Sequence, residues 1–211
     1  MKLKYPRTFH CPWSEGATND DKILKDMSSF LGKEVVVTIK MDGENTTLGR
    51  DYLHARSLDS AHHPSRDWVK AFHATFKNQL GDDFRICGEN LYAQHSIHYK
   101  ELESYFLAFS TWEGHWCSHW DETKGYCDLL GIKTVREIYR GTFNNEVTMK
   151  IVLQRLYEED DDIKEGYVIR LVDSFHYDDF KESVAKFVRK NHVQTDDHWM
   201  HGSIIPNKIK K

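Results

Sequence analysis

The sequence lacks the features of membrane, secreted and disordered proteins. No apolar run approaches the ~18 residues of a membrane-spanning helix, and the N-terminus has no apolar signal-peptide core. Only four prolines occur in 211 residues, and no low-complexity stretch interrupts the chain. The cysteines form no Cys-x-x-Cys pair: Cys11, Cys87, Cys117 and Cys127. We therefore expect reduced thiols, no membrane partner and a cytoplasmic location, including the cytoplasm of a virus-infected cell.

Excess positive charge is also missing. The chain has 29 Lys and Arg against 33 Asp and Glu, a net charge of -4. Non-specific nucleic-acid binding depends on neutralising phosphates, so this balance argues against a general coat protein. Any basic residues that bind nucleic acid must gather on one face. With 39% hydrophobic residues in 211, the chain is long enough for one well-filled core, and we expect a single domain over residues 1–211.

Helical periodicity occurs in four segments. Asn19 and Asp20 supply N-cap signals, Gly32 supplies a C-cap signal, and apolar residues recur between them at helical spacing: Ile23, Leu24, Met27, Phe30 and Leu31. This pattern predicts a helix over 19–32. A second helix is predicted from Pro64 to Gly81, with aromatic residues every four positions on a core-facing side. Shorter helical patterns cover 126–130 and 147–156.

Strand patterns outnumber the long helices. A β-branched run over 35–39 predicts a buried strand that ends near Lys40. Asp42-Gly43 is a turn signal, and the following residues 46–48 are interpreted as the returning strand of a hairpin. Further strands are predicted over 84–87, 105–112, 166–172 and 183–189. Because strands and helices do not alternate strictly, we predict an α+β fold of mainly antiparallel sheets flanked by helices.

The segment Lys40-Met41-Asp42-Gly43 is the first candidate for chemistry. It places an amine at a strand end, a carboxylate two residues later and a glycine that permits a sharp turn. Taken alone, such a lysine is more often a solvated charge. Other polar and aromatic residues follow at or beside predicted strands in a definite order: Gly88-Glu89-Asn90, Phe109, Glu165-Gly166, Lys186, Arg189 and Lys190.

In this order the residues resemble the covalent nucleotidyltransferase superfamily of DNA ligases, RNA ligases and messenger-RNA capping enzymes. The chain looks most like ATP-dependent RNA ligases of the phage RNA ligase 2 type. The resemblance runs from the first predicted strand to Lys190. It implies a nucleotidyltransferase domain with an ATP pocket between its sheets and helices, ATP and Mg²⁺ or Mn²⁺ as cofactors, and RNA ends as substrates.

The resemblance also implies a role for each site residue. Lys40 would attack the α-phosphate of ATP and hold AMP covalently. Glu89 would bind the ribose hydroxyl, Phe109 would stack on adenine, Glu165 would hold a divalent metal and Lys186 would contact the α-phosphate. The resemblance gives contacts with the nucleotide or the RNA end to two further residues, Asn45 and Arg56. Apart from the resemblance, His62 and His63 follow Arg56 in a stretch that we expect near the RNA ends, although such histidines are more often ordinary loop residues.

The residue types suit nucleotidyl transfer for general reasons. A lysine becomes a nucleophile only where neighbouring cations, a metal or desolvation favour its neutral amine. Transfer of a phosphoryl group requires neutralisation of the charge on its oxygens, which a divalent metal and basic side chains provide. An aromatic ring on a strand can stack on a base. Read separately, these residues are also compatible with surface charges, a core phenylalanine and a guarded edge strand.

Two features depart from the family pattern. Many relatives have Lys-x-Lys in the last strand, whereas this chain has Lys186-Phe187-Val188-Arg189-Lys190, so either Arg189 or Lys190 assists Lys186; strand alternation places Lys190 on the face of Lys186. About twenty residues follow Lys190, too few for the C-terminal domain of many relatives. We therefore expect a minimal ligase, with a partner protein as a possible replacement for that domain.

Three alternatives remain open at this level. A DNA ligase or a capping-type guanylyltransferase would use the same covalent lysine with another acceptor or nucleotide. A non-catalytic module would bind nucleotide or nucleic acid on the same fold. A structural zinc site is a less favoured hypothesis, because the spacing of its ligands fits no standard zinc module: His115, Cys117, His119 and Cys127.

Overall fold

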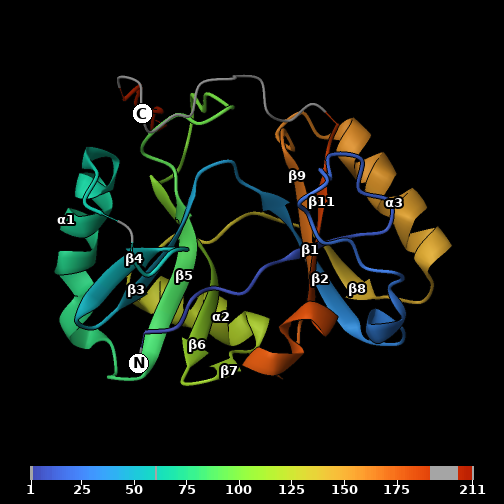
Figure 1. Cartoon of the computed structure of the whole chain (residues 1–211), viewed down its shortest axis with the longest axis horizontal. Coiled ribbons are helices and arrows are strands. Elements are labelled where there is room, and N and C mark those ends of the chain that lie inside the picture. The colour runs from blue at the N-terminus through green and yellow to red at the C-terminus, as the bar shows by residue number, and fades with distance from the viewer. Residues whose placement is uncertain (1, 60, 191–203, 211) are drawn as a thin grey trace. The chain divides into compact units, whose positions relative to one another are not determined.

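A computed structural model describes residues 2–59, 61–190 and 204–210, and its backbone contacts divide them into two compact units. Unit 1 contains the described residues of 1–5, 42–134 and 193–211, and unit 2 contains those of 6–41 and 135–192. Both combine sheets with helices (Figure 1), as the α+β prediction requires. The prediction of one domain over residues 1–211 stays a prediction.

Unit 2 is built on a five-stranded sheet in the order β1-β11-β9-β2-β8. These strands are β1 (Phe9–His10), β11 (Val184–Val188), β9 (Gly166–Leu171), β2 (Glu34–Lys40) and β8 (Glu137–Thr142). Strands β1 and β11 pair in parallel, whereas β11 with β9, β9 with β2 and β2 with β8 pair antiparallel. The β-branched run of β2 is fully buried over 35–37, which explains its uninterrupted apolar pattern.

Helical elements of unit 2 are α3 (Glu146–Glu159) and two 3₁₀ turns, η1 (Ser28–Phe30) and η4 (Tyr177–Glu182), beside the short strand β10 (Phe175–His176). Asn145 caps α3 by accepting a hydrogen bond from the Thr148 amide, as expected for an N-cap asparagine. The helix predicted over 147–156 is therefore confirmed and extends further at both ends.

The helix predicted over 19–32 is wrong. Only the 3₁₀ turn η1 forms there, because tertiary contacts hold the chain extended. Residue Ile23 forms a parallel bridge with His10, whose amide donates to Lys22 O at 2.7 Å and whose carbonyl accepts from Leu24 N at 2.8 Å. These bonds take the backbone groups that a helix would use internally.

Unit 1 contains β7 (Trp116–Cys117), β6 (Phe106–Glu113), β5 (Phe84–Asn90), β3 (Glu44–Gly49) and β4 (Tyr52–Ala55), which neighbour one another in that order. The strand pairs of this series are antiparallel. The hairpin predicted around Asp42-Gly43 is wrong, because β2 pairs with β8 and β9 whereas β3 pairs with β4 and β5. The turn signal instead marks the change from one sheet to another.

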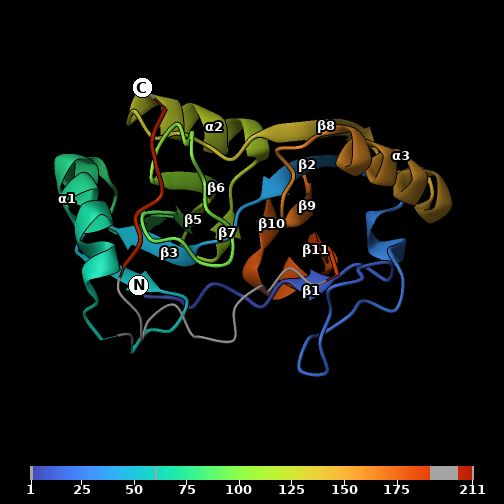
Figure 2. The same cartoon turned by 90° about the horizontal axis from the view of Figure 1, so that it is seen from above.

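The helices of unit 1 are α1 (Asp67–Phe76), extended by the 3₁₀ turns η2 (Pro64–Arg66) and η3 (Lys77–Gln79), and α2 (Trp120–Leu129). The helix predicted from Pro64 to Gly81 is confirmed in this segmented form. Its aromatic side is core, since Phe76 is buried with Leu48, Ile86 and Phe106 of the sheet and Phe72 packs against them. Helix α2 lies along β6 (Figure 2). Among the described residues, no helix meets the length and apolarity that crossing a membrane requires.

Candidate functional site

Lys40 is the last residue of β2, and Glu165 immediately precedes β9. The antiparallel register places Lys40 opposite Gly166, so the two polar side chains meet at one end of the sheet. Lys40 Nζ lies 2.7 Å from Glu165 Oε1 and donates to Oε2 at 2.8 Å. The Glu165 side chain is only 7% exposed, against 23% for Lys40. The structure thus brings the predicted nucleophile and the predicted metal ligand into direct contact.

Gly166 makes this geometry possible. Its backbone φ of 153° is one that residues with a side chain rarely adopt. A Cβ atom at this position would also lie 2.0 Å from Phe187 O of β11. No larger residue fits this close approach. The glycine therefore lets β9 begin directly between β2 and β11. Glu165 is the residue just before the first residue of this strand.

Lys186 lies in β11 opposite Val168 of β9. Its Nζ is 3.7 Å from Asp21 Oδ1, and the same oxygen is 3.3 Å from Nε2 of the buried His10. Burial opposes ionisation of Asp21, but hydrogen bonds from Thr18 and the charges of Lys186 and His10 outweigh it and lower the pKa of Asp21 to about 2. Asp21 is thus an ionised partner of Lys186. The sequence pattern had predicted Asp21 to lie in a helix.

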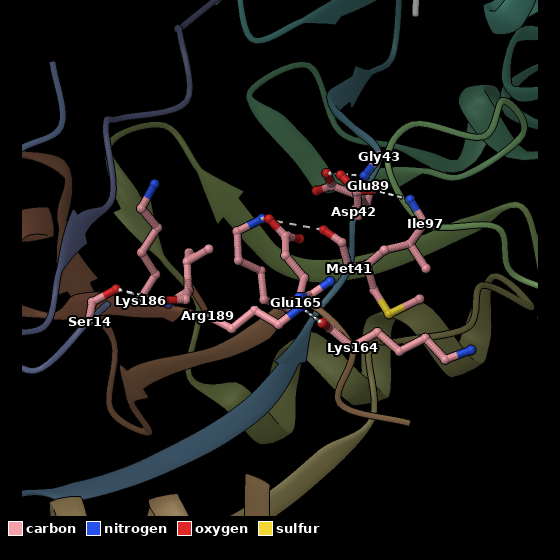
Figure 3. A network of polar contacts seen from close by, with 12 residues as sticks. Ser14, Met41, Asp42, Gly43, Glu89, Ile97, Lys164, Glu165, Lys186 and Arg189 are labelled. Atoms are coloured by element: carbon pink, nitrogen blue, oxygen red, sulfur yellow. Dashed lines mark hydrogen bonds and ion pairs between the residues drawn. The ribbon is translucent and has the colours of Figure 1, made fainter. Parts of the chain in front are cut away.

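Arg189 and Lys190 both lie beyond the end of β11. The Arg189 Nε donates to Lys164 O at 2.6 Å, and the Arg189 amide donates to Glu165 O at 3.0 Å (Figure 3). Arg189 therefore supports the chain around Glu165. Lys190 is exposed in a turn, where the strand alternation used to place it on the face of Lys186 no longer applies.

In unit 1, Asn45 and Glu89 occupy opposite positions of the paired strands β3 and β5. Directly paired residues project to the same face of a sheet. Glu89 Oε1 accepts a hydrogen bond from Gly43 N at 3.2 Å (Figure 3). Asn45 Oδ1 is buried, and no described group hydrogen-bonds to it, so an acceptor without a described donor lies on the strand position opposite Glu89.

Phe109 lies on β6 at a bulge. Ser110 pairs with Cys87 and Ala108 pairs with Gly88, so Phe109 is the extra residue between two successive pairs. A bulge redirects the side chain of the residue that it inserts. The half-buried Phe109 ring contacts Tyr5 edge to face, with 5.2 Å between ring centroids. The strand prediction was right here, whereas the bulge had no signal in the sequence.

Arg56 follows β4 directly and is exposed. The loop after it is anchored at Arg66, which is buried and makes a bidentate ion pair with Glu44 at 2.6 and 2.5 Å. The histidines of this loop serve local structure: His63 caps η2 by accepting from Ser65 N, and His62 contacts Lys70 and Asp67 of α1.

Asp42 is held by the loop between β5 and β6. Its amide donates to Tyr99 Oη at 2.9 Å. Its Oδ2 accepts from Ile97 N at 2.8 Å (Figure 3). Neither Tyr99 nor Ile97 was a candidate from sequence. The length of the unpatterned stretch 91–104 was the available signal, since long loops without secondary structure commonly hold functional residues.

Two residues of the zinc hypothesis have structural roles. His119 caps α2 by accepting from Asp121 N, and Cys127 is buried in the core of unit 1. Among the described residues, no group of three or more His, Cys, Asp or Glu side chains is arranged to hold a metal. The four cysteines, which all lie in the described part of the chain, are buried and are not joined by disulfide bonds.

The predicted residues therefore fall into two sets, each described within its own unit. Unit 2 holds Lys40 with Glu165, and Lys186 with Asp21. Unit 2 also holds Arg189 and Lys190 beyond the end of β11. Unit 1 holds four predicted residues in or beside strands: Asn45, Arg56, Glu89 and Phe109. The segment Lys40-Met41-Asp42 joins the two units covalently.

The family comparison covers most of the chain. The sequence model of the RNA ligase family matches residues 33–188. This span begins just before β2 and ends with β11, so it excludes Asp21, Arg189 and Lys190 and includes the other residues of the two sets. No curated protein matches the sequence.

Solved structures show a related fold. An archaeal ATP-dependent RNA ligase is 15% identical, with a TM-score of 0.54 over 78% of this chain and 45% of its own. A variant of the Naegleria gruberi RNA ligase with ATP and Mn is 12% identical, with a TM-score of 0.51 over 90% and 60%. A putative ATP-dependent DNA ligase from Aquifex aeolicus is 18% identical, with a TM-score of 0.51 over 77% and 46%. The chain thus spans about half the length of these proteins.

Proposed function

Because the chain belongs to the RNA ligase family, we propose that it is an ATP-dependent RNA ligase with Lys40 as its covalent nucleophile. The observation that supports this most directly is the Lys40–Glu165 contact at 2.7 Å. It places a half-buried amine at a strand end beside a buried carboxylate, which suits a nucleophile that must be oriented before it reacts. The residue order further suggests the phage RNA ligase 2 type.

In the first step, the neutral Lys40 amine attacks the α-phosphorus of ATP. A phosphorus–nitrogen bond forms, the bond from that phosphorus to the bridging oxygen of pyrophosphate breaks, and the amine loses a proton. Lys40 then holds AMP through a phosphoamide bond. Lys186 would contact the α-phosphate during this step, since a fixed ammonium stabilises charge on the phosphate oxygens; Asp21 keeps that ammonium in place.

Glu165 is the residue of this chain that would hold the divalent metal. Mg²⁺ is commonly bound by one or two carboxylates together with substrate phosphates and water, so one protein carboxylate at the site fits such an ion, and Mn²⁺ equally. The metal would supply positive charge to the phosphate oxygens. Glu165 also accepts a hydrogen bond from the Lys40 ammonium. It would therefore first orient the nucleophile and then bind the metal.

Unit 1 would recognise the nucleotide. Glu89, held by the Gly43 amide, would accept a hydrogen bond from a ribose hydroxyl. The buried Asn45 Oδ1 without a described partner offers a second acceptor on the same face. Phe109 would stack on adenine, as an aromatic side chain can do at a small entropy cost. Arg56, which is exposed beyond β4, would contact the RNA end or the nucleotide phosphate.

Two further steps would complete the ligation. A 5′-phosphate oxygen of RNA attacks the phosphorus held by Lys40, the phosphorus–nitrogen bond breaks, and AMP moves to the RNA end. The 3′-hydroxyl of the second end then attacks the 5′-phosphorus, a phosphodiester forms and AMP leaves. Unit 1 would position these ends through Arg56 beside β4.

Self-adenylylation tests the proposal. Incubation with ATP labelled at the α-phosphate and Mg²⁺ or Mn²⁺ should give an acid-labile, AMP-labelled protein, and Lys40→Ala should abolish the label. Lys33→Ala, which changes an exposed lysine in the same unit, should label as the wild type does. Persistent labelling of Lys40→Ala would overturn the assignment of the nucleophile. Labelling from GTP instead of ATP would indicate a capping-type enzyme, and no label from either would indicate a binding module.

A further inference from the structure

The loop over 91–105 in unit 1 depends on a distant part of the chain. This loop connects β5 to β6 without helix or strand, so its backbone groups need partners outside secondary structure. The segment 204–210, which we call the clasp, supplies them. Two isolated bridges mark its path along the loop, Ala93 with Pro206 and Leu102 with Ile209.

Backbone hydrogen bonds join the clasp to the loop along its length. The clasp carbonyl of Ile205 accepts from Gln94 N at 2.8 Å. Lys208 N donates to Tyr99 O at 2.9 Å and Lys208 O accepts from Leu102 N at 2.9 Å. Bonds at both ends of the clasp and in its middle fix the loop at several points, as a paired strand would.

Asn207 is the central residue of the clasp, and it is 1% exposed. Its Nδ2 donates to Leu91 O at 2.8 Å and to Ala93 O at 3.4 Å, and its Oδ1 accepts from Tyr99 N at 2.8 Å. Its backbone carbonyl accepts from Tyr105 Oη at 2.9 Å. One buried side chain thus connects the beginning of the loop with Tyr99.

The same loop holds the turn after the proposed nucleophile. Tyr99, whose amide binds Asn207, accepts through its Oη from Asp42 N, and Ile97 N donates to the Asp42 carboxylate. Asp42 is therefore fixed at its main chain and its side chain by residues of one loop. Neither contact survives unless the loop keeps its conformation.

We propose that Asn207 is a positioning residue for the Asp42 turn, and through that turn for Lys40 two residues earlier. The clasp fixes the loop, Tyr99 and Ile97 of the loop fix Asp42, and Asp42 follows Lys40 by two residues in the chain. The expected effect on the reaction of Lys40 rests on the proposed function. The mechanical link from Asn207 to Asp42 does not.

Point variants of the full chain separate these two parts. Asn207→Leu removes all side-chain hydrogen bonds at similar size, and Asn207→Asp keeps the acceptor for Tyr99 N while losing both donors. Tyr99→Phe removes only the hydroxyl that contacts Asp42 N, and Tyr92→Phe, in the same loop, leaves that contact intact. Val69→Ala, in the buried core of unit 1, is the control for a general loss of stability.

The first readout is the rate of self-adenylylation at saturating ATP. We expect a fall of about 10-fold or more in Asn207→Leu and Tyr99→Phe, because misplacement of a reacting group by about 1 Å has effects of this size. The double variant should be little slower than either single variant, since both act on one contact. Tyr92→Phe and Val69→Ala should keep the wild-type rate.

The second readout is hydrogen exchange at the amides of Asp42 and Ile97, which requires no activity. Both should exchange at least about 10-fold faster in Asn207→Leu than in Val69→Ala, because local opening is decided by the contacts that close it. Unchanged exchange would overturn the positioning role even if labelling slowed. A wild-type chain that never labels, together with this faster exchange, would overturn the proposed function and leave the positioning role standing.

Discussion

The two units hold their functional side chains by different means. In unit 2, each important ammonium faces a carboxylate: Lys40 faces Glu165 and Lys186 faces Asp21. In unit 1, the carboxylates of Asp42 and Glu89 accept hydrogen bonds from backbone amides. Charge pairs keep a side chain in place only while both partners are ionised, whereas an amide donor depends on the conformation of its loop.

This difference predicts different sensitivities. Removing a charge without changing shape should disturb unit 2 strongly, because the partner ammonium loses its counter-charge. The same change in unit 1 should be milder, since a neutral side-chain oxygen can still accept from a backbone amide. Four measurements examine this contrast, ordered by the size of the expected effect.

Glu165→Gln should have the largest effect, with adenylylation about 100- to 1000-fold slower than in the wild type. The change removes the counter-charge of Lys40 and the proposed metal ligand while keeping the side chain almost the same size. Single-turnover labelling with ATP measures the rate, and Glu159→Gln, an exposed carboxylate of α3, is the control. A rate within a factor of about three of wild type would remove Glu165 from the mechanism.

Asp21→Asn should slow adenylylation by about 10-fold, because Lys186 loses the charge that anchors it while its own charge remains. The variant protein should stay folded, which circular dichroism verifies. Its neighbour Asp20 is exposed, so Asp20→Asn controls for a change of charge in the same segment. Equal rates in the two variants would show that Lys186 needs no anchor.

Glu89→Gln should raise the half-saturating ATP concentration by only about 3-fold, because the amide oxygen can still accept from Gly43 N and from a ribose hydroxyl. Glu89→Ala, which loses the acceptor, should have the larger effect. If Glu89→Gln reduced adenylylation as strongly as Glu165→Gln, the contrast between charge pairs in unit 2 and amide contacts in unit 1 would be wrong.

The smallest effect concerns the pH dependence of stability. Burial lowers the pKa of His54 and of His73 in unit 1. As the pH falls, these two histidines therefore become protonated at a higher pH in the unfolded chain than in the folded chain. Unit 1 should therefore lose stability as the pH falls below about 6.5, the ordinary histidine pKa.

The stability of unit 2 should depend on pH in a lower pH range. Asp21 has its pKa lowered to about 2, and an unfolded aspartate titrates near 3.9. Its contribution is complete above about pH 4 and is lost as the pH falls toward 2. Hydrogen exchange of peptides from each unit at about pH 7.5 and 5.5 should show accelerated opening in unit 1 with little change around Asp21. A uniform response would contradict this separation.

The regular elements of the fold were predictable from sequence where the pattern was local. The β-branched run of β2 and the four-residue aromatic period of α1 determine their own structures, because each buries the face that its period creates. The segment 19–32 shows the limit. Its caps and spacing suit a helix, but the bridge between His10 and Ile23 and the contacts of Asp21 stabilise an extended path.

The positions of the candidate residues in or beside strands were predictable from sequence, and their contacts were less so, while their roles in a site stay predictions. Lys40, placed at the end of a strand from its sequence context, lies there. Asp21 and Tyr99 were not predicted because each acts on a residue far away in the chain, and no short motif records such a contact. The bulge at Phe109 depends on the register of two strands, which a single strand cannot encode.

The reactivity of the buried cysteines should report local unfolding of the protein. Cys11 lies in unit 2 and the other three in unit 1, each at most 1% exposed. Burial raises the pKa values of Cys11, Cys87 and Cys127, so the reactive thiolate is scarce as well as shielded. A thiol reagent should modify the chain only through local unfolding, and the site that reacts first identifies the unit that opened, with no engineered label.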